Sequence, residues 1–338
     1  MKLQEVKKGI VNFILYKGEE VFVYKDKIVV GCKTLSANTE ENYRCVQDVL
    51  YKQTDDENDI DVLSRFDGDS FVEESFRYEF KKYINSRKSF SYEFEKGVVR
   101  VSSKTDGVES LFEFEAKKRY KVLELDNSSE ILVLCIGGIA KELLFYTKTG
   151  ERLWEYKVEE GREIHESGVM VVDDIVVIPC TEDDAPISVE GYNLLTGEKL
   201  WEVDDEDYCN YCYVIGPNKM LYALSSYYCD GGSVELHLCE LNPFTGETNK
   251  KELKEGRHWD DIHPADTVIY GNKLFYVNQI KKEGCSVGAV DLETKELIDD
   301  TPLESQGNTV EKPIVTDDKI YVRIRELNEL RIYENEFK

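Results

Sequence analysis

KELLFYTKTGERLWEYKV, residues 141–158, reads as two short strands joined by a Thr-Gly turn. Versions of this stretch recur as YNLLTGEKLW at 192–201, LNPFTGETNK at 241–250 and VDLETKELI at 290–298. The turn threonine returns every 47 to 49 residues, at Thr149, Thr196, Thr245 and Thr294. A period of this length indicates a repeat architecture in which each copy is one supersecondary unit.

Residues that favour tight turns occupy matching places in these copies. The place three residues before the threonine holds a short polar side chain that can hydrogen-bond nearby backbone: Asn193, Asn242 and Asp291. Gly150, Gly197 and Gly246 follow the threonine and supply a positive φ without steric cost. The last copy has Lys295 at this place, so we expect its turn to differ.

A second turn, built on Asp or Asn between apolar runs, recurs at 24–30, 172–178, 216–223, 270–277 and 316–322. Apolar and β-branched residues on both sides of a short polar break indicate a hairpin. One period therefore holds about four strands. Four antiparallel strands every 40–50 residues are typical of a β-propeller blade.

The pattern D-x-x-T-G-x-x-L-W, preceded by D-G-x-[IV]-Y-V, resembles the repeat of quinoprotein-type (PQQ-like) β-propellers, with the best match over residues 141–298. The resemblance implies an all-β fold, and it implies that Trp154 and Trp201 pack between blades. With 338 residues, we predict a single domain of seven four-stranded antiparallel blades, with six blades as the alternative. Quinoprotein dehydrogenases hold their quinone against two adjacent cysteines, and no adjacent pair occurs in this sequence. We therefore predict no cofactor.

The two ends of the chain are predicted to share one blade. Residues 2–16 read as a lone strand, while residues 313–334 supply three strands. We predict that the N-terminal strand adds the fourth and closes the last blade, which removes an exposed edge. An insertion at about 33–60 departs from the repeat, and its middle is predicted to form a short helix capped by Asn38 or Thr39.

The charge of the chain restricts its partners. The formal net charge is −25, which argues against nucleic acid, because phosphate binding needs a basic patch. The same charge argues against anionic membrane surfaces. It suits a basic protein partner or simply a soluble acidic surface, and we expect a monomer.

The cysteines and the N-terminus predict a cytoplasmic protein. The nine cysteines are scattered along the chain. The apolar stretch at 10–16 is too short for a signal peptide and contains Asn12. An odd number of cysteines without such a signal indicates reduced thiols. No apolar run approaches the roughly 18 residues of a membrane span.

The longer loops are predicted to gather on one face, which we call the linker face. In this type of propeller, the linkers between blades and the loops between second and third strands surround the mouth of the central channel. These segments are 159–167, 180–190, 204–212, 225–233, 255–266 and 278–286, and many of them combine acidic residues with Tyr or Trp. The candidate partner-binding residues are Trp259, Asp260, Tyr208, Tyr211, Tyr227, Tyr228, Asp183, Asp184 and Asp205.

Two clusters have residue types that bind metals. In HWDDIH, His258 and His263 are candidate ligands, although their spacing matches no established zinc motif. His165 occupies the equivalent linker of an earlier copy, so these histidines can also be read as packing residues. Cys209 and Cys212 form a C-x-x-C pair, but a strand would place them on opposite faces, so we expect structural thiols.

These observations favour a non-catalytic, protein-binding propeller whose acidic, aromatic-rich linker face binds a basic protein. One version is a cytoplasmic immunity protein that neutralises a basic toxin such as a nuclease. The alternative is a metal-dependent, hydrolase-type enzyme centred on His258, His263 and Asp260. A third reading is a scaffold resembling the outer-membrane assembly lipoprotein that shares this repeat. The sequence has no phosphate loop, nucleophile elbow or dinucleotide-binding fingerprint.

Overall fold

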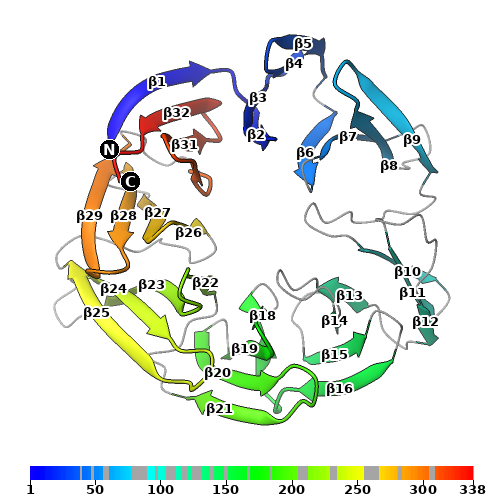
Figure 1. Cartoon of the computed structure of the whole chain (residues 1–338), viewed down its shortest axis with the longest axis vertical. Coiled ribbons are helices and arrows are strands. Elements are labelled where there is room, and N and C mark those ends of the chain that lie inside the picture. Colours follow the sequence, from blue (N-terminus) through cyan, green and yellow to red (C-terminus); the bar gives the residue numbers. More distant parts are fainter. Residues whose placement is uncertain are drawn as a thin grey trace. The chain divides into compact units, whose positions relative to one another are not determined.

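The computed structural model describes the chain except for residues 39, 47–48, 56–60, 78–89, 96–97, 104–111, 116–119, 124–130, 137–140, 148–150, 166–167, 183–184, 205–211, 229–233, 255–265, 281–283, 304–308 and 338. The elements β1 to β32 of this described part are all β-strands (Figure 1). The strands form eight sheets, and their registered pairs are antiparallel. Among the described residues, no helix has the length and apolar character needed to cross a membrane.

The chain divides into two compact units. The N-terminal unit comprises Val6–Lys117 and Leu327–Leu330, and the C-terminal unit comprises Met1–Glu5, Lys118–Glu326 and Arg331–Lys338.

The N-terminal unit holds three sheets. The first contains β2 (Asn12–Tyr16), β3 (Glu19–Val23), β4 (Lys27–Val30) and β5 (Lys33–Ser36). The second contains β6 (Asn42–Val46), β7 (Val49–Asp55), β8 (Asp61–Phe66) and β9 (Phe71–Arg77). The third contains β10 (Phe90–Glu95), β11 (Val98–Ser103) and β12 (Phe112–Glu115).

The C-terminal unit holds four sheets in chain order. The first contains β13 (Tyr120–Leu123), β14 (Ile131–Ile136), β15 (Glu142–Thr147) and β16 (Arg152–Lys157), and the second contains β17 (Glu163–Ile164), β18 (Met170–Val172), β19 (Ile175–Glu182), β20 (Ala185–Asn193) and β21 (Lys199–Val203). The third contains β22 (Val214–Ile215), β23 (Leu221–Tyr228), β24 (Val234–Leu241) and β25 (Thr248–Lys254). The fourth contains β26 (Val268–Tyr270), β27 (Lys273–Ile280), β28 (Gly284–Asp291) and β29 (Glu296–Pro302).

The last sheet combines strands from both ends of the chain. It contains β30 (Ile314–Val315), β31 (Lys319–Ile324) and β32 (Glu329–Glu334), with β1 (Lys2–Lys8) beside β32. The N-terminal strand therefore occupies the edge position in the C-terminal sheet, and closure of a ring through this sheet stays a prediction. The sequence treated residues 2–16 as one strand, but they form β1 and β2, separated at Gly9 by a positive φ of 78°.

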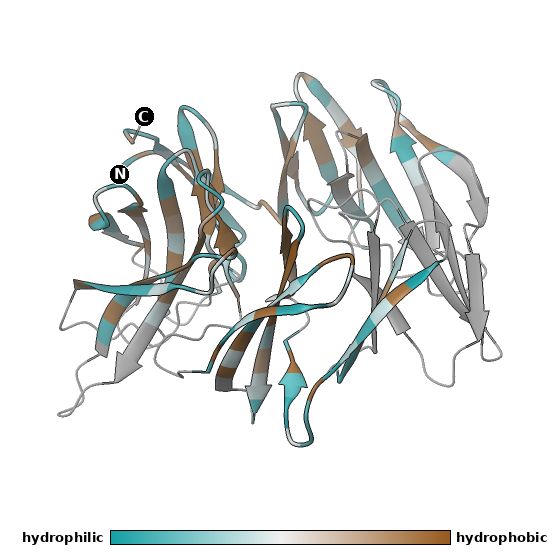
Figure 2. Cartoon of the chain, turned by 60° about the horizontal axis from the view of Figure 1, so that its bottom comes forward, coloured by the Kyte–Doolittle hydropathy of each residue, from teal (hydrophilic) through white to brown (hydrophobic). Residues whose placement is uncertain are grey.

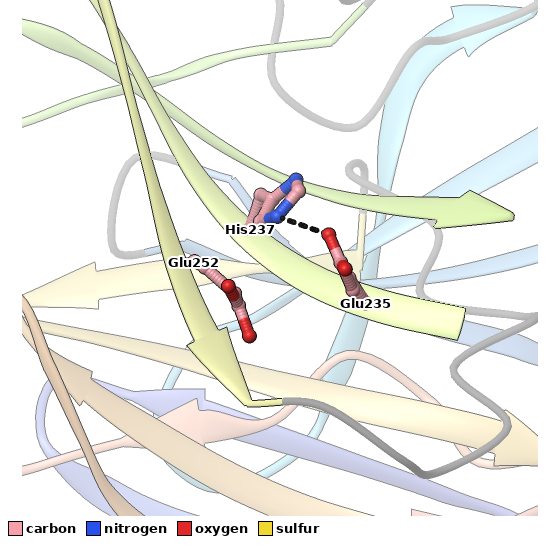
Figure 3. A group of neighbouring side chains, drawn as sticks. All are labelled: Glu235, His237 and Glu252. Atoms are coloured by element: carbon pink, nitrogen blue, oxygen red, sulfur yellow. Dashed lines mark ion pairs between the residues drawn. The ribbon is translucent and has the colours of Figure 1, made fainter. Parts of the chain in front are cut away.

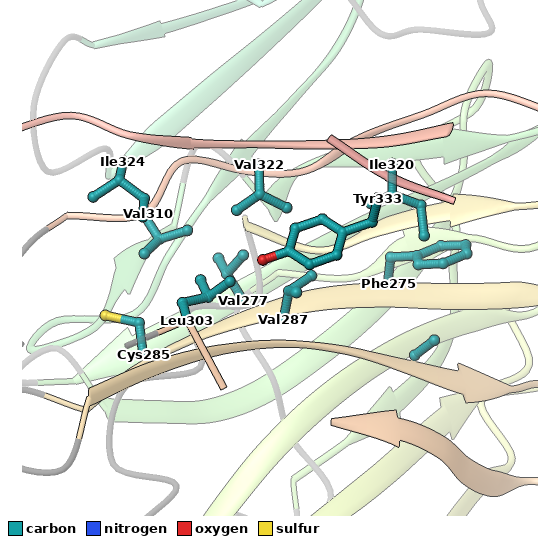
Figure 4. Close-up of a cluster of buried hydrophobic side chains, with 11 residues drawn as sticks. Phe275, Val277, Cys285, Val287, Leu303, Val310, Ile320, Val322, Ile324 and Tyr333 are labelled. Carbon is teal, nitrogen blue, oxygen red and sulfur yellow. The ribbon is translucent and has the colours of Figure 1, made fainter. Parts of the chain in front are cut away.

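Successive sheets of the C-terminal unit pack face to face (Figure 1). Alternate side chains of one strand point to opposite faces, so each inner strand serves two interfaces. In β27, Leu274 and Tyr276 pack toward the preceding sheet, while Phe275 and Val277 pack toward β30–β32 (Figure 4). Figure 2 shows the resulting hydrophobic bands along the strands and hydrophilic residues at many turns. Complete burial of each such side chain contributes about 1.5–3 kcal/mol.

Two tryptophans join consecutive sheets. Trp154 of β16 donates its indole N–H to the carbonyl of Leu194 at 2.8 Å, in the turn after β20. Trp201 of β21 donates in the same way to the carbonyl of Pro243 at 2.8 Å, in the turn after β24. A buried indole N–H needs such a partner, and the turn of the next sheet supplies it. The predicted role of both tryptophans in packing between blades is confirmed.

The turns before β21 and β25 have the predicted chemistry. Asn193 Oδ1 accepts the backbone amides of Leu195 at 3.0 Å and Thr196 at 2.9 Å. Gly197 and Gly246 have positive φ values of 70° and 75°. Gly150, the third predicted turn glycine, lies outside the described residues.

The turn before β29 corrects one prediction. Lys295 takes the same left-handed conformation as the glycines, with φ 57°. Asp291 Oδ1 accepts the amides of Glu293 at 2.8 Å and Thr294 at 2.9 Å, as Asn193 does in its own turn. Lys295 also forms an ion pair with Glu240. These contacts offset the roughly 1–2 kcal/mol that a left-handed residue with a Cβ costs.

The helix predicted within the insertion at about 33–60 is wrong. Asn38 does make local bonds of the capping type, since its Oδ1 accepts the amide of Glu40 at 2.8 Å and its own amide donates to Glu41 at 3.0 Å. The chain then continues into the β6–β7 hairpin, in which Tyr43 and Leu50 are buried. Tyr, Cys and Val favour strands, and pairing with β8 gives the hairpin a third strand.

The described strands form eight sheets, one more than the seven blades predicted, and the number of blades stays a prediction. The sequence predicted that residues at about 33–60 are an insertion that departs from the repeat. In the structure, β2–β5 and β6–β9 are each a complete four-stranded sheet. Tyr16 and Phe66 meet edge-on between these two sheets, with ring centroids 6.1 Å apart.

Candidate functional site

Most of the predicted site residues lie outside the described part of the chain. This holds for the partner-binding candidates Trp259, Asp260, Tyr208, Tyr211, Asp183, Asp184 and Asp205, and for the metal candidates His258 and His263. Tyr227 and Tyr228 belong to β23, but only their backbone is described. The structure therefore leaves the grouping of these side chains as a prediction.

Described residues next to these segments lie at one end of the sheets. We call it the linker end, because the second strand of a sheet ends there and the fourth strand leaves from there toward the next sheet. Exposed acidic residues at this end include Glu159, Glu160, Glu182 and Asp204. Of these, Glu159 has an ion pair with Arg162 at 3.7 Å. Several exposed acidic residues thus lie at the described part of the linker end.

His165 and Cys212 also lie near this end. His165 is half-buried, and its backbone amide donates to the carbonyl of Pro179 at 3.1 Å. Cys212 is buried, and its Sγ lies 3.8 Å from His165 Nδ1. This packing fits the structural role expected for His165 and Cys212, while Cys209 lies outside the described residues.

The described residues bring together one cluster that sequence reasoning missed. Glu235, His237 and Glu252 each place a possible ligand atom within 4.8 Å of the other two (Figure 3). Glu235 and His237 come from β24, and Glu252 comes from β25. His237 Nε2 lies 3.1 Å from Glu235 Oε2. We call these three residues the Glu-His-Glu cluster.

Strand geometry explains the cluster. Glu235 and His237 are two residues apart, so they share one face of β24. Cys239 and Leu241 continue that face into the core against the β17–β21 sheet. The face therefore changes from apolar to ionisable toward the linker end. Burial follows the same direction, since His237 is buried and Glu235 is half-buried.

A displaced β-bulge puts Glu252 opposite His237. In β16, β21 and β29 one residue has no partner opposite it on the neighbouring strand, and it always lies four places after the turn threonine. These bulged residues are Leu153, Leu200 and Ile298. In β25 the bulged residue is Leu253, near the other end of the strand. With the bulge at the usual place, Leu253 would face His237 in place of Glu252. A one-residue slip reverses which face a side chain occupies.

Burial controls the charge of the histidine. Desolvation lowers the pKa of His237, and the nearby positive charge of Lys250 lowers it further. The carboxylates of Glu235 and Glu252 act in the opposite direction but do not prevail. His237 is therefore neutral at pH 7, with one ring nitrogen available as an acceptor or ligand.

The Glu-His-Glu cluster could have been found only in part from sequence. The E-x-H pattern at 235–237 predicts two metal-ligand types on one face of a strand. Glu252 could not be added, because its place opposite His237 depends on where the bulge falls. A cross-strand pair needs the register, which repeat spacing does not give.

Comparison with known proteins agrees with the fold. The chain is similar to the crystal structure of BamB from Moraxella catarrhalis, with 10% identity, a TM-score of 0.59 and coverage of 99% of this chain and 98% of that chain. The chain is less similar to Hsv2 from Kluyvelomyces marxianus, with 11% identity, a TM-score of 0.49 and coverage of 88% of this chain and 92% of that chain. The Cps50 (Swd1) β-propeller domain from Myceliophteria thermophila has 7% identity and a TM-score of 0.49, and the match covers 92% of this chain and 99% of that chain. No curated protein matches the chain in sequence.

A family model covers more than half of the chain. Its description is "Outer membrane protein assembly factor BamB", and it matches residues 128–334. These residues include the repeats at 141–158, 192–201, 241–250 and 290–298 from which the fold was predicted. The chain is a β-propeller of the PQQ-like repeat type and belongs to the family described as outer membrane protein assembly factor BamB.

Proposed function

We propose that this chain is a non-catalytic, protein-binding propeller that binds a basic protein through its linker end. The observation that carries the proposal is its membership of a propeller family described as an assembly factor. A rigid set of sheets that presents loops at one end suits binding, because binding residues concentrate on loops held by a scaffold.

The charge of the chain supports a basic partner. The net charge is −25, and Glu159, Glu160, Glu182 and Asp204 are exposed at the linker end. Such a surface steers a cationic protein toward it and raises the association rate. The predicted acidic contacts Asp183, Asp184 and Asp205 follow Glu182 and Asp204 directly in sequence, and Asp260 belongs to the predicted linker segment at 255–266.

Aromatic residues supply the predicted anchors of the interface. Trp259, Tyr208, Tyr211, Tyr227 and Tyr228 belong to segments that leave the linker end. Tyr and Trp dominate binding energy because they bury large areas at low entropic cost. In one version, the protein is a cytoplasmic immunity protein that neutralises a basic toxin.

We also propose that the eight sheets are the blades of one propeller, which β1 closes by completing the sheet with β30–β32. The edge position of β1 in that sheet supports this arrangement. Pairing strands from the two chain ends removes sheet edges that would otherwise be exposed.

A charge-reversal experiment tests the binding proposal. The variant Asp204→Lys/Asp205→Lys reverses two acids at the linker end. The control Glu198→Lys/Glu247→Lys reverses two exposed acids at the opposite, turn end, with the same change in net charge. The immobilised wild type, variant and control are incubated with native cell lysate at low salt, washed at high salt, and the eluted proteins are identified by mass spectrometry.

We expect the wild type and the control to retain the same basic protein at low salt and to release it at high salt. The linker-end variant should retain much less of it, because the reversed charges repel a cationic partner. Equal retention by variant and control would contradict the proposal.

Family membership also favours a second candidate, a scaffold for assembly of outer-membrane proteins. Retention of outer-membrane proteins in the same experiment would favour this candidate. Metal-dependent hydrolysis that His258→Ala and His263→Ala abolish would favour the enzymatic alternative.

A further inference from the structure

The Glu-His-Glu cluster has the composition of a metal site. One imidazole and two carboxylates are a ligand set that Zn²⁺ and related divalent transition metals accept. Glu235 and His237 can reach one ion together because they lie two residues apart on one face of β24. Glu252 approaches from the neighbouring strand, and the three ligand atoms lie within 4.8 Å of one another (Figure 3).

The two carboxylates of the cluster favour a cation, while the nearby positive charge of Lys250 opposes one. Two carboxylates placed this close repel each other, and the repulsion is stronger near a buried group than in bulk water. His237 is buried, whereas Glu252 is exposed. An ion would therefore be held on the protein side and remain open to solvent on the side of Glu252, where water can complete its coordination.

The displaced bulge gives an independent reason to regard the cluster as a site. In the pairs β15–β16, β20–β21 and β28–β29, the bulge lies near the turn that joins the two strands. In the β24–β25 pair it lies at the linker end. This placement exchanges Leu253 for Glu252 opposite His237. Bulges that aim a side chain occur frequently beside functional sites.

We propose that Glu235, His237 and Glu252 bind one divalent transition-metal ion of the Zn²⁺ class. The ion would cross-link β24 and β25 at the end from which residues 229–233 and 255–265 continue the chain. Its role would be to fix this end of the sheet. The site is a prediction about metal binding alone and does not depend on a protein partner.

The test uses the full chain with Cys32 replaced by Ser, because Cys32 is an exposed thiol that can bind Zn²⁺ on its own. After removal of metals with a chelator, ZnCl₂ binding is measured by calorimetry for the parent chain, Glu252→Gln and Glu247→Gln. Glu247 is the matched control, since it is an exposed glutamate at the turn end of the same hairpin. Glu252→Gln keeps the shape of an exposed side chain, so loss of folding does not confound the result.

We expect one ion per chain for the parent and for Glu247→Gln, and an affinity at least about tenfold lower for Glu252→Gln. The parent should gain about 4 °C in melting temperature at a Zn²⁺ concentration one hundred times Kd. In the presence of chelator the order should reverse, with Glu252→Gln melting slightly above the parent, because one of two repelling charges is gone. The crystal structure with Zn²⁺ should show an anomalous peak about 2.0–2.2 Å from ligand atoms of the three residues.

Equal affinity for Glu252→Gln and Glu247→Gln would overturn the proposal, as would the absence of any binding at millimolar Zn²⁺. An anomalous peak at a cysteine and none at the Glu-His-Glu cluster would overturn it as well. None of these results bears on whether the linker end binds a protein, so the two proposals fail separately.

Discussion

The contact between Trp201 and Gly191 is the most sharply testable part of the packing. These residues are paired across β20 and β21, and the indole lies over the glycine. A Cβ added to Gly191 would lie 2.1 Å from Trp201 Cε2 and 2.4 Å from its Nε1. The indole is 9% exposed and is held by its hydrogen bond to the carbonyl of Pro243. The ring therefore cannot move aside without breaking the connection to the next sheet.

These distances set the expected energies. Trp201→Ala should cost about 3–5 kcal/mol, as for other buried aromatic truncations. Gly191→Ala should cost about 1–3 kcal/mol through overpacking, although alanine normally suits a strand better than glycine. When both changes are combined, the new methyl group enters space that the indole has left. The second change should then cost little, which gives a favourable coupling energy of about 1–3 kcal/mol.

Urea unfolding of the four proteins measures this coupling. Far-UV circular dichroism is the suitable signal, because two of the four proteins lack Trp201 and differ in fluorescence. The midpoint and slope of each transition give the free energy of unfolding. Additive effects, within about 0.5 kcal/mol, would refute the account of the contact, and so would a Gly191→Ala protein as stable as the wild type.

Three further predictions concern turns, acid stability and thiols. Gly246→Ala should lower the free energy of unfolding in urea by at least about 1–2 kcal/mol. The reason is that φ is 75° at this residue and that a Cβ would lie 2.9 Å from Trp201. An unchanged unfolding midpoint would contradict this prediction. Hydrogen bonds from two backbone amides and from Lys273 hold the pKa of Asp291 below its usual value. Its contribution to stability is therefore present above the unfolded pKa and is lost as pH falls through the folded pKa. Asp291→Asn keeps the turn bonds but loses the charge, so it should be less stable than the wild type at pH 7. The difference should shrink as the pH falls below the ordinary Asp pKa of about 3.9, and a constant difference would oppose this reasoning. Alkylation followed by mass spectrometry should label exposed Cys32 long before Cys180, whose thiol pKa is raised by burial, and similar labelling rates would be inconsistent with the structure.

The repeat made much of the C-terminal unit predictable. Asn193 and Gly197 form the turn that their residue types require, and Trp154 and Trp201 join consecutive sheets. These features depend on residues close together in sequence or one repeat apart. The conformation of Lys295 was not predictable from its own identity, because the hydrogen bonds of Asp291 determine it.

The N-terminal unit was harder to predict because its signals are ambiguous over short windows. Asn38 makes bonds of the capping type, and a helix was expected to follow. The same residues alternate well enough to form β6 and β7, and pairing with β8 stabilises that outcome. Tertiary pairing overrides local propensity in such cases. The insertion is therefore part of a separate four-stranded sheet that the sequence did not predict.

The candidate sites were also only partly predictable from sequence, because pairing between strands decides which side chains meet. Sequence reasoning selected segments rich in Asp, Tyr and Trp, and the exposed acids described at the linker end are consistent with that choice. It did not find the Glu-His-Glu cluster, since Glu252 reaches His237 only through a displaced bulge. Composition identifies loops well, but register decides which side chains of neighbouring strands meet.

Amide hydrogen exchange of the chain, alone and with its captured basic partner, tests the central claim most directly. Binding at the linker end predicts added protection in residues 159–165, 180–190 and 204–213, and unchanged exchange in the turns at 193–198 and 242–247. Protection confined to those turns would contradict the account and would place the partner at the opposite end of the sheets.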